Sequence, residues 1–317
     1  MNKAIKRFLL TTMMLLLLVT VTACGNTTES TAEISDVATD VTSEEQDQVT
    51  KKVRIGSKDF TENLIVSELY ALALENAGFD VERVPNIAGS IIHASIINDE
   101  IDLYPEYTGT GLLSILKEPL LTDPEEVYQT VKAGYDEQFS ITWLDYSAAN
   151  DGQGLVIRTD VAEKYGIFTI TDLQKNASDI RFASQGEFDL REDGIPALEK
   201  IYGKFEWKSS KIYDNGLKYE VLKNDEADVA PAYTTEGQLV NTEDFTLLVD
   251  DKQVWPPYNL TPIVRNNVLD ANPEIAAILN EISARLDTKT ITELNAKVDV
   301  DKQEFEEVAK DFFESMK

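Results

Sequence analysis

An eleven-residue segment occurs twice in this chain. It reads "NDEIDLYPEYT" from Asn98 and "NDEADVAPAYT" from Asn224, with seven of the eleven positions identical and 126 residues between the two starts. A repeat with so long an offset and only two copies does not fit a solenoid and indicates two duplicated structural units. We therefore expect two lobes that face each other, each presenting the tyrosine of its repeat, Tyr107 or Tyr233, to one ligand.

Residues 1–23 have the order of a secretory signal peptide. Three basic residues precede an apolar run from Phe8 to Val21, which is too short for a membrane span, and small residues then lead to Cys24. The segment "VTAC" at residues 21–24 resembles the lipobox of bacterial lipoproteins, in which the cysteine is acylated and becomes the new amino terminus. The alternative is a buried anchor helix that ends in cysteine by chance. Cys24 is the only cysteine, which excludes an intramolecular disulfide and fits acylation.

Residues 24–52 are expected to be the acylated Cys24 and a disordered acidic tether. The segment 25–50 is rich in Thr, Ser, Glu and Asp and contains no aromatic residue. Removal of residues 1–23 takes away Lys3, Lys6 and Arg7, so that the formal net charge changes from −28 to −31. Such a charge argues against nucleic-acid binding, which needs basic patches. It favours the approach of a cation, although salt screens this attraction beyond about 8–10 Å.

The remainder is long enough for two core-bearing units, since the chain has 317 residues and is 43% hydrophobic. Residues 53–57 predict a buried strand, followed by a helix that Asp59 caps and Gly78 stops, with Leu64, Ile65, Leu69 and Leu72 on its apolar face. Residues 79–84 predict a second strand, parallel to the first. A helix from Gly89-Ser90 through Asn98 and a short strand over 101–104 lead to the repeated turn.

The second half shows the same order of elements. Residues 180–184 predict a strand, residues 195–202 a helix, and residues 227–231 a strand that runs into the second turn. The segments "GLVIRTDV" (154–161) and "TPIVRNNV" (261–268) are predicted to cross between the halves as a hinge. We expect one lobe from residues 53–154 and 262–317 and the other from residues 155–261. Helices after Asn272 should return to the first lobe.

Tyrosine rings that surround a void attract a cation. In open parallel sheets ligands bind beyond the carboxyl ends of strands, and Tyr107 and Tyr233 are both predicted a few residues past such ends. The face of a tyrosine ring carries negative quadrupole density, and this suits a quaternary ammonium group, which has no N–H to donate. The alternative is that these tyrosines are half-buried packing residues, as single tyrosines commonly are.

Four segments in order resemble the substrate-binding lipoproteins of osmoprotectant ABC importers, which take up glycine betaine, choline, carnitine and related quaternary amines. They are "IGSKDFTENLIVSELY", "IDLYPEYTGTGL", "EFDLREDG" and "WPPYNLTPIVR", and the similarity runs from Val53 to the end. The resemblance implies a type II periplasmic-binding-protein fold, in which two α/β lobes joined by two hinge strands close on the ligand. It also implies an extracytoplasmic protein, monomeric and held at the membrane by Cys24, with an ABC permease as partner.

The resemblance further implies a set of ligand-binding residues. The aromatic cage would use Tyr107, Tyr233 and Tyr258. The carboxylate end of a betaine would meet Lys58, Thr110 and Arg191, and a guanidinium can hold a carboxylate through two parallel hydrogen bonds. The alternative for Lys58 and Arg191 is an ordinary solvated charge.

Two positions depart from the family pattern. Gln153 stands where relatives commonly have a further cage tyrosine. It either weakens binding, or hydrogen-bonds a more polar ligand, or leaves a place that Tyr146 fills. Ser90 stands where choline-selective relatives have an acidic residue. A neutral hydroxyl there suggests zwitterions such as betaine, carnitine or a trimethylated histidine derivative (ergothioneine), unless Ser90 is only a helix cap.

An enzyme is the main competing class, because Asp99/Glu100 or Asp102/Glu106 could serve in acid–base work. However, the sequence has one histidine, His93, on the apolar side of a predicted helix, and neither a P-loop nor a dinucleotide-binding glycine pattern. It also lacks a His/Cys cluster for a metal. We therefore expect no catalysis, no cofactor and no metal site. A sensory lipoprotein with the same fold is the second alternative.

Overall fold

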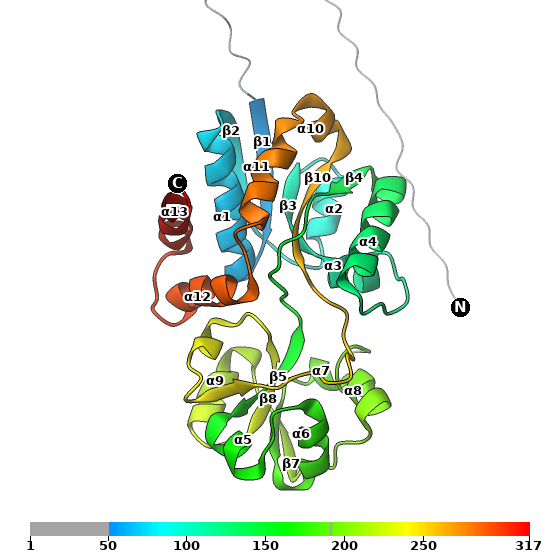
Figure 1. Cartoon of the computed structure of the whole chain (residues 1–317), viewed down its shortest axis with the longest axis vertical. Helices are drawn as coiled ribbons and strands as arrows, with labels where there is room; N and C mark the ends of the chain where they lie inside the picture. The colour runs from blue at the N-terminus through cyan, green and yellow to red at the C-terminus, as the bar shows by residue number, and fades with distance from the viewer. Residues whose placement is uncertain (1–50, 191) are drawn as a thin grey trace, which may run out of the picture. The chain divides into compact units, whose positions relative to one another are not determined.

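The computed structural model describes residues 51–190 and 192–317. These residues form two five-stranded mixed sheets with helices packed on them, which confirms the α/β class and the two lobes. The first lobe occupies the upper part of Figure 1 and the second the lower part. The predicted signal peptide, Cys24, the tether up to residue 50 and Arg191 lie outside the described residues. Of the predicted tether, Lys51 and Lys52 instead begin the first strand.

The first sheet has the strand order β2-β1-β3-β10-β4. Strand β1 pairs in parallel with β2 and β3, which confirms the predicted βαβ unit, whereas β10 is antiparallel to β3 and β4. Its strands are β1 (Lys51–Lys58), β2 (Phe79–Ile87), β3 (Leu103–Tyr107), β4 (Ile141–Trp143) and β10 (Leu260–Arg265). Its helical segments in this part of the chain are α1 (Thr61–Asn76), α2 (Ile92–Ile97), α3 (Thr108–Thr110), the π-helical η1 (Gly111–Ile115) and α4 (Pro124–Phe139).

Helix α1 differs from its prediction in two respects. Its N-cap is Phe60 without a side-chain cap, because Asp59 lies one residue too early in the chain to reach the first free N–H groups. The helix is also buried on more than one face, with Val66 and Tyr70 inaccessible while Leu64 and Leu72 are partly exposed. The reason is that helices from the end of the chain pack against the side of α1 that the prediction left in solvent.

The second sheet has the order β7-β6-β8-β5-β9 and repeats the directions of the first. Strand β6 is parallel to β7 and β8, and β5 is antiparallel to β8 and β9. Its strands are β5 (Gln153–Arg158), β6 (Arg181–Ser184), β7 (Ser209–Ile212), β8 (Val229–Tyr233) and β9 (Phe245–Leu247). Its helical segments are α5 (Thr159–Tyr165), α6 (Ile170–Asn176), η2 (Ala177–Asp179), α7 (Glu187–Leu190), α8 (Ile195–Tyr202), η3 (Asn215–Leu217), α9 (Lys218–Lys223) and η4 (Gly237–Val240).

The chain crosses twice between the lobes. It leaves the first sheet after β4 to enter the second as β5, and leaves the second after β9 to enter the first as β10. Figure 1 shows these two connections side by side between the lobes. Strands β5 and β10 occupy equivalent positions in their sheets, each antiparallel to the strand that carries a repeat. The two predicted segments thus begin as the strands that directly follow the crossings, whereas the crossings themselves are made by residues 144–152 and 248–259.

The acidic half of each repeat has a structural role. Asp102 accepts from the backbone N–H of Arg54 (2.8 Å) and from its guanidinium, and Asp228 does the same with Arg181 (2.8 Å). The aspartate that begins each turn, Asp99 or Asp225, takes a left-handed backbone conformation. Each repeat joins a helix to the following strand in this way. Duplication of the lobe therefore explains why the acidic residues of the two repeats are identical, without a role in ligand binding.

The second half of each repeat is a strand, which corrects the predicted turn. Tyr107 and Tyr233 are the last residues of β3 and β8 rather than residues beyond them. Pro105 is tolerated inside β3 because Pro105 and Pro262 form a non-hydrogen-bonded pair of the β3–β10 ladder. The bonds from the Arg265 N–H to the Asp102 carbonyl and from the Thr108 N–H to the Asn259 carbonyl place the hydrogen-bonded pairs at the positions before and after Pro105. The side chain of Tyr107, at the last position of β3, packs at the edge of the first lobe's hydrophobic core.

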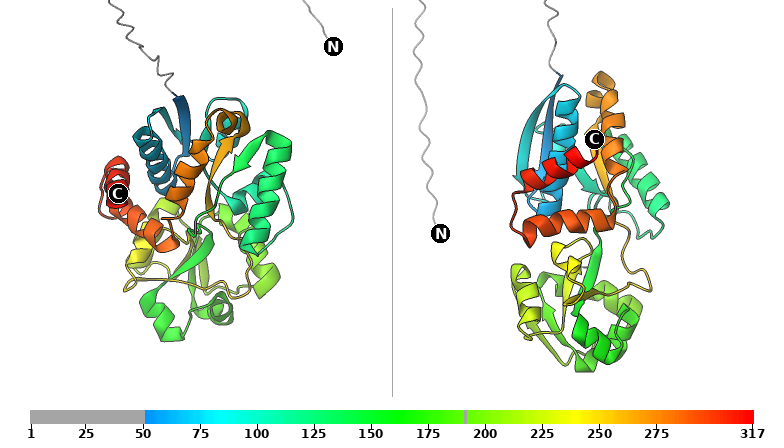
Figure 2. Two further views of the ribbon diagram at one scale, coloured as in Figure 1. Left: turned by 45° about the horizontal axis from the view of Figure 1, so that its top comes forward. Right: turned by 60° about the vertical axis from the view of Figure 1, so that its left-hand side comes forward.

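The C-terminal helices pack against the first lobe, as predicted. Helices α11, α12 and α13 all contact α1, and Figure 2 shows α12 and α13 beside the first lobe in both views. Helix α12 also touches η4 of the second lobe, where a Cβ on Gly237 would meet the backbone of Ala296 at 2.6 Å. Backbones therefore approach closely on this side of the cleft. The helices are α10 (Asn266–Ala271), α11 (Glu274–Ser283), α12 (Thr288–Asp299) and α13 (Phe305–Ser315).

Candidate functional site

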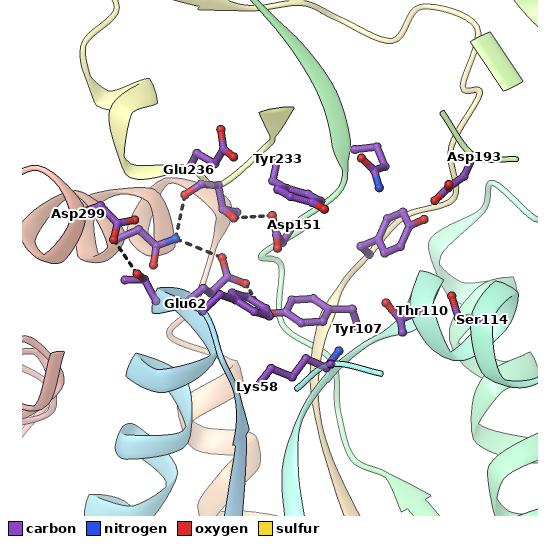
Figure 3. Close-up of a pocket in the computed structure, with 17 residues that line it drawn as sticks. Lys58, Glu62, Tyr107, Thr110, Ser114, Asp151, Asp193, Tyr233, Glu236 and Asp299 are labelled. Atoms are coloured by element: carbon purple, nitrogen blue, oxygen red, sulfur yellow. Dashed lines mark hydrogen bonds between the residues drawn. The ribbon is translucent and has the colours of Figure 1, made fainter. Parts of the chain in front are cut away.

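A cavity of about 510 Å³ lies between the two lobes, within the range usual for small-molecule sites. Its walls come from the ends of β1, β3 and β8, from both crossing segments and from α12 (Figure 3). It is lined by Lys58, Phe60, Thr61, Glu62, Gly89, Tyr107, Thr110, Ser114, Asp151, Gln153, Asp193, Tyr233, Thr235, Glu236, Tyr258, Asn295 and Asp299.

Six of the eight predicted ligand-binding residues meet at this cavity: Lys58, Tyr107, Thr110, Gln153, Tyr233 and Tyr258. Ser90 is exposed and does not line it, although its neighbour Gly89 does. Arg191 lies outside the described residues. Tyr146 does not replace a cage ring, because its hydroxyl donates to Glu125 (3.2 Å) and its ring packs on Tyr128 in the first lobe.

The aromatic rings come from both lobes. Tyr107 is buried at the end of β3, whereas Tyr233, at the end of β8, is 38% exposed. Phe60, which sequence reasoning missed, lies 6.1 Å from Tyr107 between ring centroids. Tyr258 sits on the second crossing segment, directly over Gly109, where an added Cβ would come within 2.7 Å of its ring. Because Gly109 has no side chain, the Tyr258 ring can pack closely against α3.

The ammonium of Lys58 is already paired in this structure. It forms a buried ion pair with Glu106, which also accepts from the hydroxyl of Tyr104 (2.9 Å) and the backbone N–H of Tyr107 (2.8 Å). The same ammonium lies 4.9 Å from the ring centroid of Tyr107. Lys58 therefore contributes to the wall of the cavity while Glu106 balances its charge.

Five carboxyl groups line the cavity, and none was predicted there: Glu62, Asp151, Asp193, Glu236 and Asp299. Glu62 is buried and accepts from the Tyr107 hydroxyl (2.9 Å), and Asp151 accepts from the Thr235 hydroxyl (2.7 Å). Burial raises the pKa of both carboxyls, and for Asp151 the nearby charge of Glu62 raises the pKa further. Glu236 differs from them, because it forms an ion pair with Lys218 and accepts from the Tyr219 hydroxyl.

Three of the four carboxyl groups that could have served an enzyme have ion-pair partners instead. Asp99 and Asp102 pair with Arg265, and Glu106 pairs with Lys58. The His93 ring packs edge-on against Tyr135 and Phe139, and burial lowers its pKa. In residues 51–190 and 192–317 no group of His, Cys, Asp and Glu side chains is placed to hold a metal ion.

The fold and the site define a two-lobed solute-binding protein, with a ligand cavity between lobes that two crossing segments join. A family model described as the substrate binding domain of ABC-type glycine betaine transport systems matches residues 51–315, and the chain belongs to this family. Its members are extracytoplasmic substrate-binding proteins of ABC importers, which work with a permease and are not enzymes.

Proteins similar to this chain are named for different ligands. The carnitine transport binding protein OpuCC of Listeria monocytogenes is 32% identical over 266 residues, 83% of this chain and 86% of that protein. The ergothioneine transport permease/ergothioneine binding protein EgtU of Helicobacter pylori is 30% identical over 268 residues, 84% of this chain and 48% of that longer protein. A crystal structure of a glycine betaine/carnitine/choline ABC transporter matches with 28% identity and a TM-score of 0.77, over 83% of this chain and 98% of that one.

Within the described part of the chain, every helix is too short or too polar to cross a bilayer.

Proposed function

We propose that this protein binds a compound with a quaternary ammonium group in the cavity between its lobes and delivers it to an ABC permease. The observation that carries the proposal is that Tyr107, Tyr233 and Tyr258, from the two lobes and a crossing segment, line one cavity. A ligand held by all three rings favours the closed arrangement of the lobes, because it contacts both at once.

The cage can supply a large part of the binding free energy. Each cation–π contact contributes roughly 0.5–1 kcal/mol when exposed and about 2 kcal/mol when desolvated. Four rings, with Phe60 as the fourth, give about 2–8 kcal/mol, whereas micromolar binding needs about 8 kcal/mol. The other end of the ligand must therefore add contacts, for which we propose Thr110, Gln153 and Arg191.

Gln153 bears on the choice of ligand. It lines the cavity and lies opposite Tyr233 in the β5–β8 pairing, so its amide is next to a cage ring. An amide in this position can donate to or accept from a polar group that an aromatic ring would exclude. We propose glycine betaine, carnitine or choline as the ligand, with ergothioneine as an alternative that has more polar atoms for Gln153.

The cellular setting forms part of the same proposal. We propose that residues 1–23 are removed, that Cys24 is acylated and that the protein acts as a membrane-anchored monomer on the outer face of the membrane. The lobes proposed are residues 53–154 with 262–317 and residues 155–261, which close about the two crossing segments. Support for the anchor comes from the order of basic, apolar and small residues before Cys24.

Calorimetry on the purified mature chain tests the proposal with glycine betaine, carnitine, choline, proline betaine and ergothioneine. Tryptophan emission gives a second readout, because the indole of Trp255 donates to the backbone carbonyl of Asp193 (2.6 Å), a residue of the cavity wall. We expect micromolar binding of at least one of these compounds. If none binds at millimolar concentration, the proposal is wrong.

Two variants and a control test the cage itself. Tyr233→Ala, at a partly exposed site, and Tyr107→Leu, which keeps a buried apolar side chain, should each weaken binding by about 1–2 kcal/mol, or roughly 5- to 30-fold. Tyr165→Ala in α5 removes a tyrosine that does not line the cavity and should bind as wild type does. Equal affinities for all four proteins would contradict the cage.

A further inference from the structure

Two carboxyl groups from distant parts of the chain meet at the wall of the cavity. Glu62 lies in the first turn of α1, and Asp151 lies on the first crossing segment, just before β5. Figure 3 shows both beside Tyr107, with Glu236 and Asp299 farther along the same wall. Neither carboxyl forms an ion pair that the structure describes with a lysine or arginine, in contrast to Glu106 and Glu236.

The two carboxyls belong to one network of hydrogen bonds. The Thr235 hydroxyl donates to Asp151 (2.7 Å), and the backbone carbonyl of Thr235 accepts from the Asn295 amide, which also donates to Glu62. These bonds hold both carboxyls at the same part of the cavity wall.

The remaining neighbours do not supply a compensating positive charge. The Tyr107 hydroxyl donates to Glu62 (2.9 Å), and the Asn295 amide donates to Glu62 (3.3 Å) and to the Thr235 carbonyl (2.8 Å). The Oδ1 atom of Asn295 is buried and has no hydrogen-bond partner in the described structure. The charged and titratable groups that face the pair are Lys58 of β1, paired with Glu106; Tyr107 of β3; Glu236 after β8, paired with Lys218; and Asp299 of α12.

Two negative charges placed close together in a buried site are unfavourable, and such pairs commonly hold one proton between them. The raised pKa values of Glu62 and Asp151 agree with this reading. A quaternary cation in the same cavity changes the balance, because its fixed charge stabilises the second carboxylate. Since the cation has no N–H, it cannot donate a hydrogen bond to the pair and interacts with it only through charge.

We propose that Glu62 and Asp151 are ligand-binding residues that share one proton in the empty site and release it to solvent when a quaternary cation enters. The exchange is balanced, since one positive charge enters the cavity and one proton leaves it. This inference rests on the proposed function, because it needs a cationic ligand in the same cavity. It assigns the pair as the negative charge that balances the cation held between the tyrosine rings. Neither residue belongs to the set of ligand-binding residues predicted from the sequence.

Calorimetric titration of choline, or of whichever quaternary compound binds, in buffers of different ionisation enthalpy measures the protons released per ligand. We expect release of up to about one proton and an affinity that rises with pH, by at most about tenfold per pH unit. The sign follows because a group with a raised pKa in the free protein loses its proton more readily once the cation is present.

Glu62→Gln and Asp151→Asn keep the shapes of the side chains and remove the shared proton. Each should abolish proton release and make the affinity independent of pH between pH 5 and 8. Asp299→Asn removes a carboxyl from the same wall, where its partner is the Thr61 hydroxyl (2.6 Å), and proton release should persist in it. Thermal unfolding monitored by circular dichroism shows whether each variant is folded, and the two substitutions serve as independent tests.

The outcomes separate this inference from the proposed function. Ligand binding without proton release, with Glu62→Gln and Asp151→Asn as tight as wild type, overturns the inference and leaves the proposed function intact. Equal loss of proton release in Asp299→Asn also overturns it, because the effect would then belong to the whole wall rather than to the pair. If no quaternary compound binds the wild-type protein, both proposals fall.

Discussion

Substitution of Gly109 by alanine should displace a cage ring without removing it. The added Cβ would lie 2.7 Å from two carbons of the Tyr258 ring and 2.9 Å from a third. An ordinary contact begins at 3.4 Å, so the ring has to move by about 0.7 Å or more. Tyr258 is partly exposed and can move into the cavity, where it no longer faces a cation held by Tyr107 and Tyr233.

The size of the effect follows from the loss of one cation–π contact. We expect Gly109→Ala to weaken binding by about 1–2 kcal/mol, or roughly 5- to 30-fold in calorimetry. The free energy of unfolding should change less, because Gly109 lies in the short helix α3, where alanine replaces glycine without a positive φ.

A double-mutant cycle isolates the mechanism. Tyr258→Ala removes the ring and so the clash, and in that background Gly109→Ala should change the affinity by less than about twofold. The reasoning is refuted if Gly109→Ala weakens binding equally in both backgrounds, since the effect would then not pass through Tyr258.

Three further predictions concern other parts of the site and fold. Gln153→Tyr should restore a ring opposite Tyr233 and tighten trimethylammonium binding by about 5- to 30-fold in calorimetry. Gln153→Leu should not tighten binding, and equal affinities of the two variants would show that no ring belongs at this position. Asp228→Ala leaves the backbone N–H of Arg181 without its acceptor and removes one of the two aspartates that its guanidinium contacts, the other being Asp225. It should lower the free energy of unfolding in urea by about 2–4 kcal/mol, with Asp225→Ala costing less; the reverse order contradicts the role given to the repeat. Because the pKa of Glu62 is raised, its stabilising contribution is present at low pH and is lost as pH rises through that pKa. The ligand-free Glu62→Gln variant should therefore gain stability relative to wild type between pH 5 and pH 8, and a relative loss would contradict this sign.

Much of the architecture could be predicted from the sequence because duplication left it visible twice. The repeat placed Tyr107 and Tyr233 at equivalent strand ends, and the two "strand then arginine" segments indicated β5 and β10. What misled the prediction was the proline, which was taken as the mark of a turn. In a non-hydrogen-bonded pair with Pro262, Pro105 costs no bond of the β3–β10 ladder and so lies within the strand.

The carboxyl groups that line the cavity could not be predicted from the spacing of residues in the sequence. Glu62 and Asp151 are far apart in the sequence, and they meet only because the first crossing segment passes the amino-terminal end of α1. A signal was nevertheless present, since Glu62 and Phe60 stand in the segment "KDFTEN" that carried the family resemblance. Ser90 was assigned to the ligand from its motif position, whereas in the structure the neighbouring Gly89 lines the cavity.

The central claim is that aromatic rings from both lobes hold a positive charge rather than an apolar shape. The most direct measurement compares the trimethylammonium ligand that binds with its tert-butyl isostere, in which carbon replaces the charged nitrogen. The cage predicts that the uncharged compound binds at least about 100-fold more weakly, since three or four cation–π contacts are lost at once. Comparable affinities for the charged and uncharged compounds would contradict it.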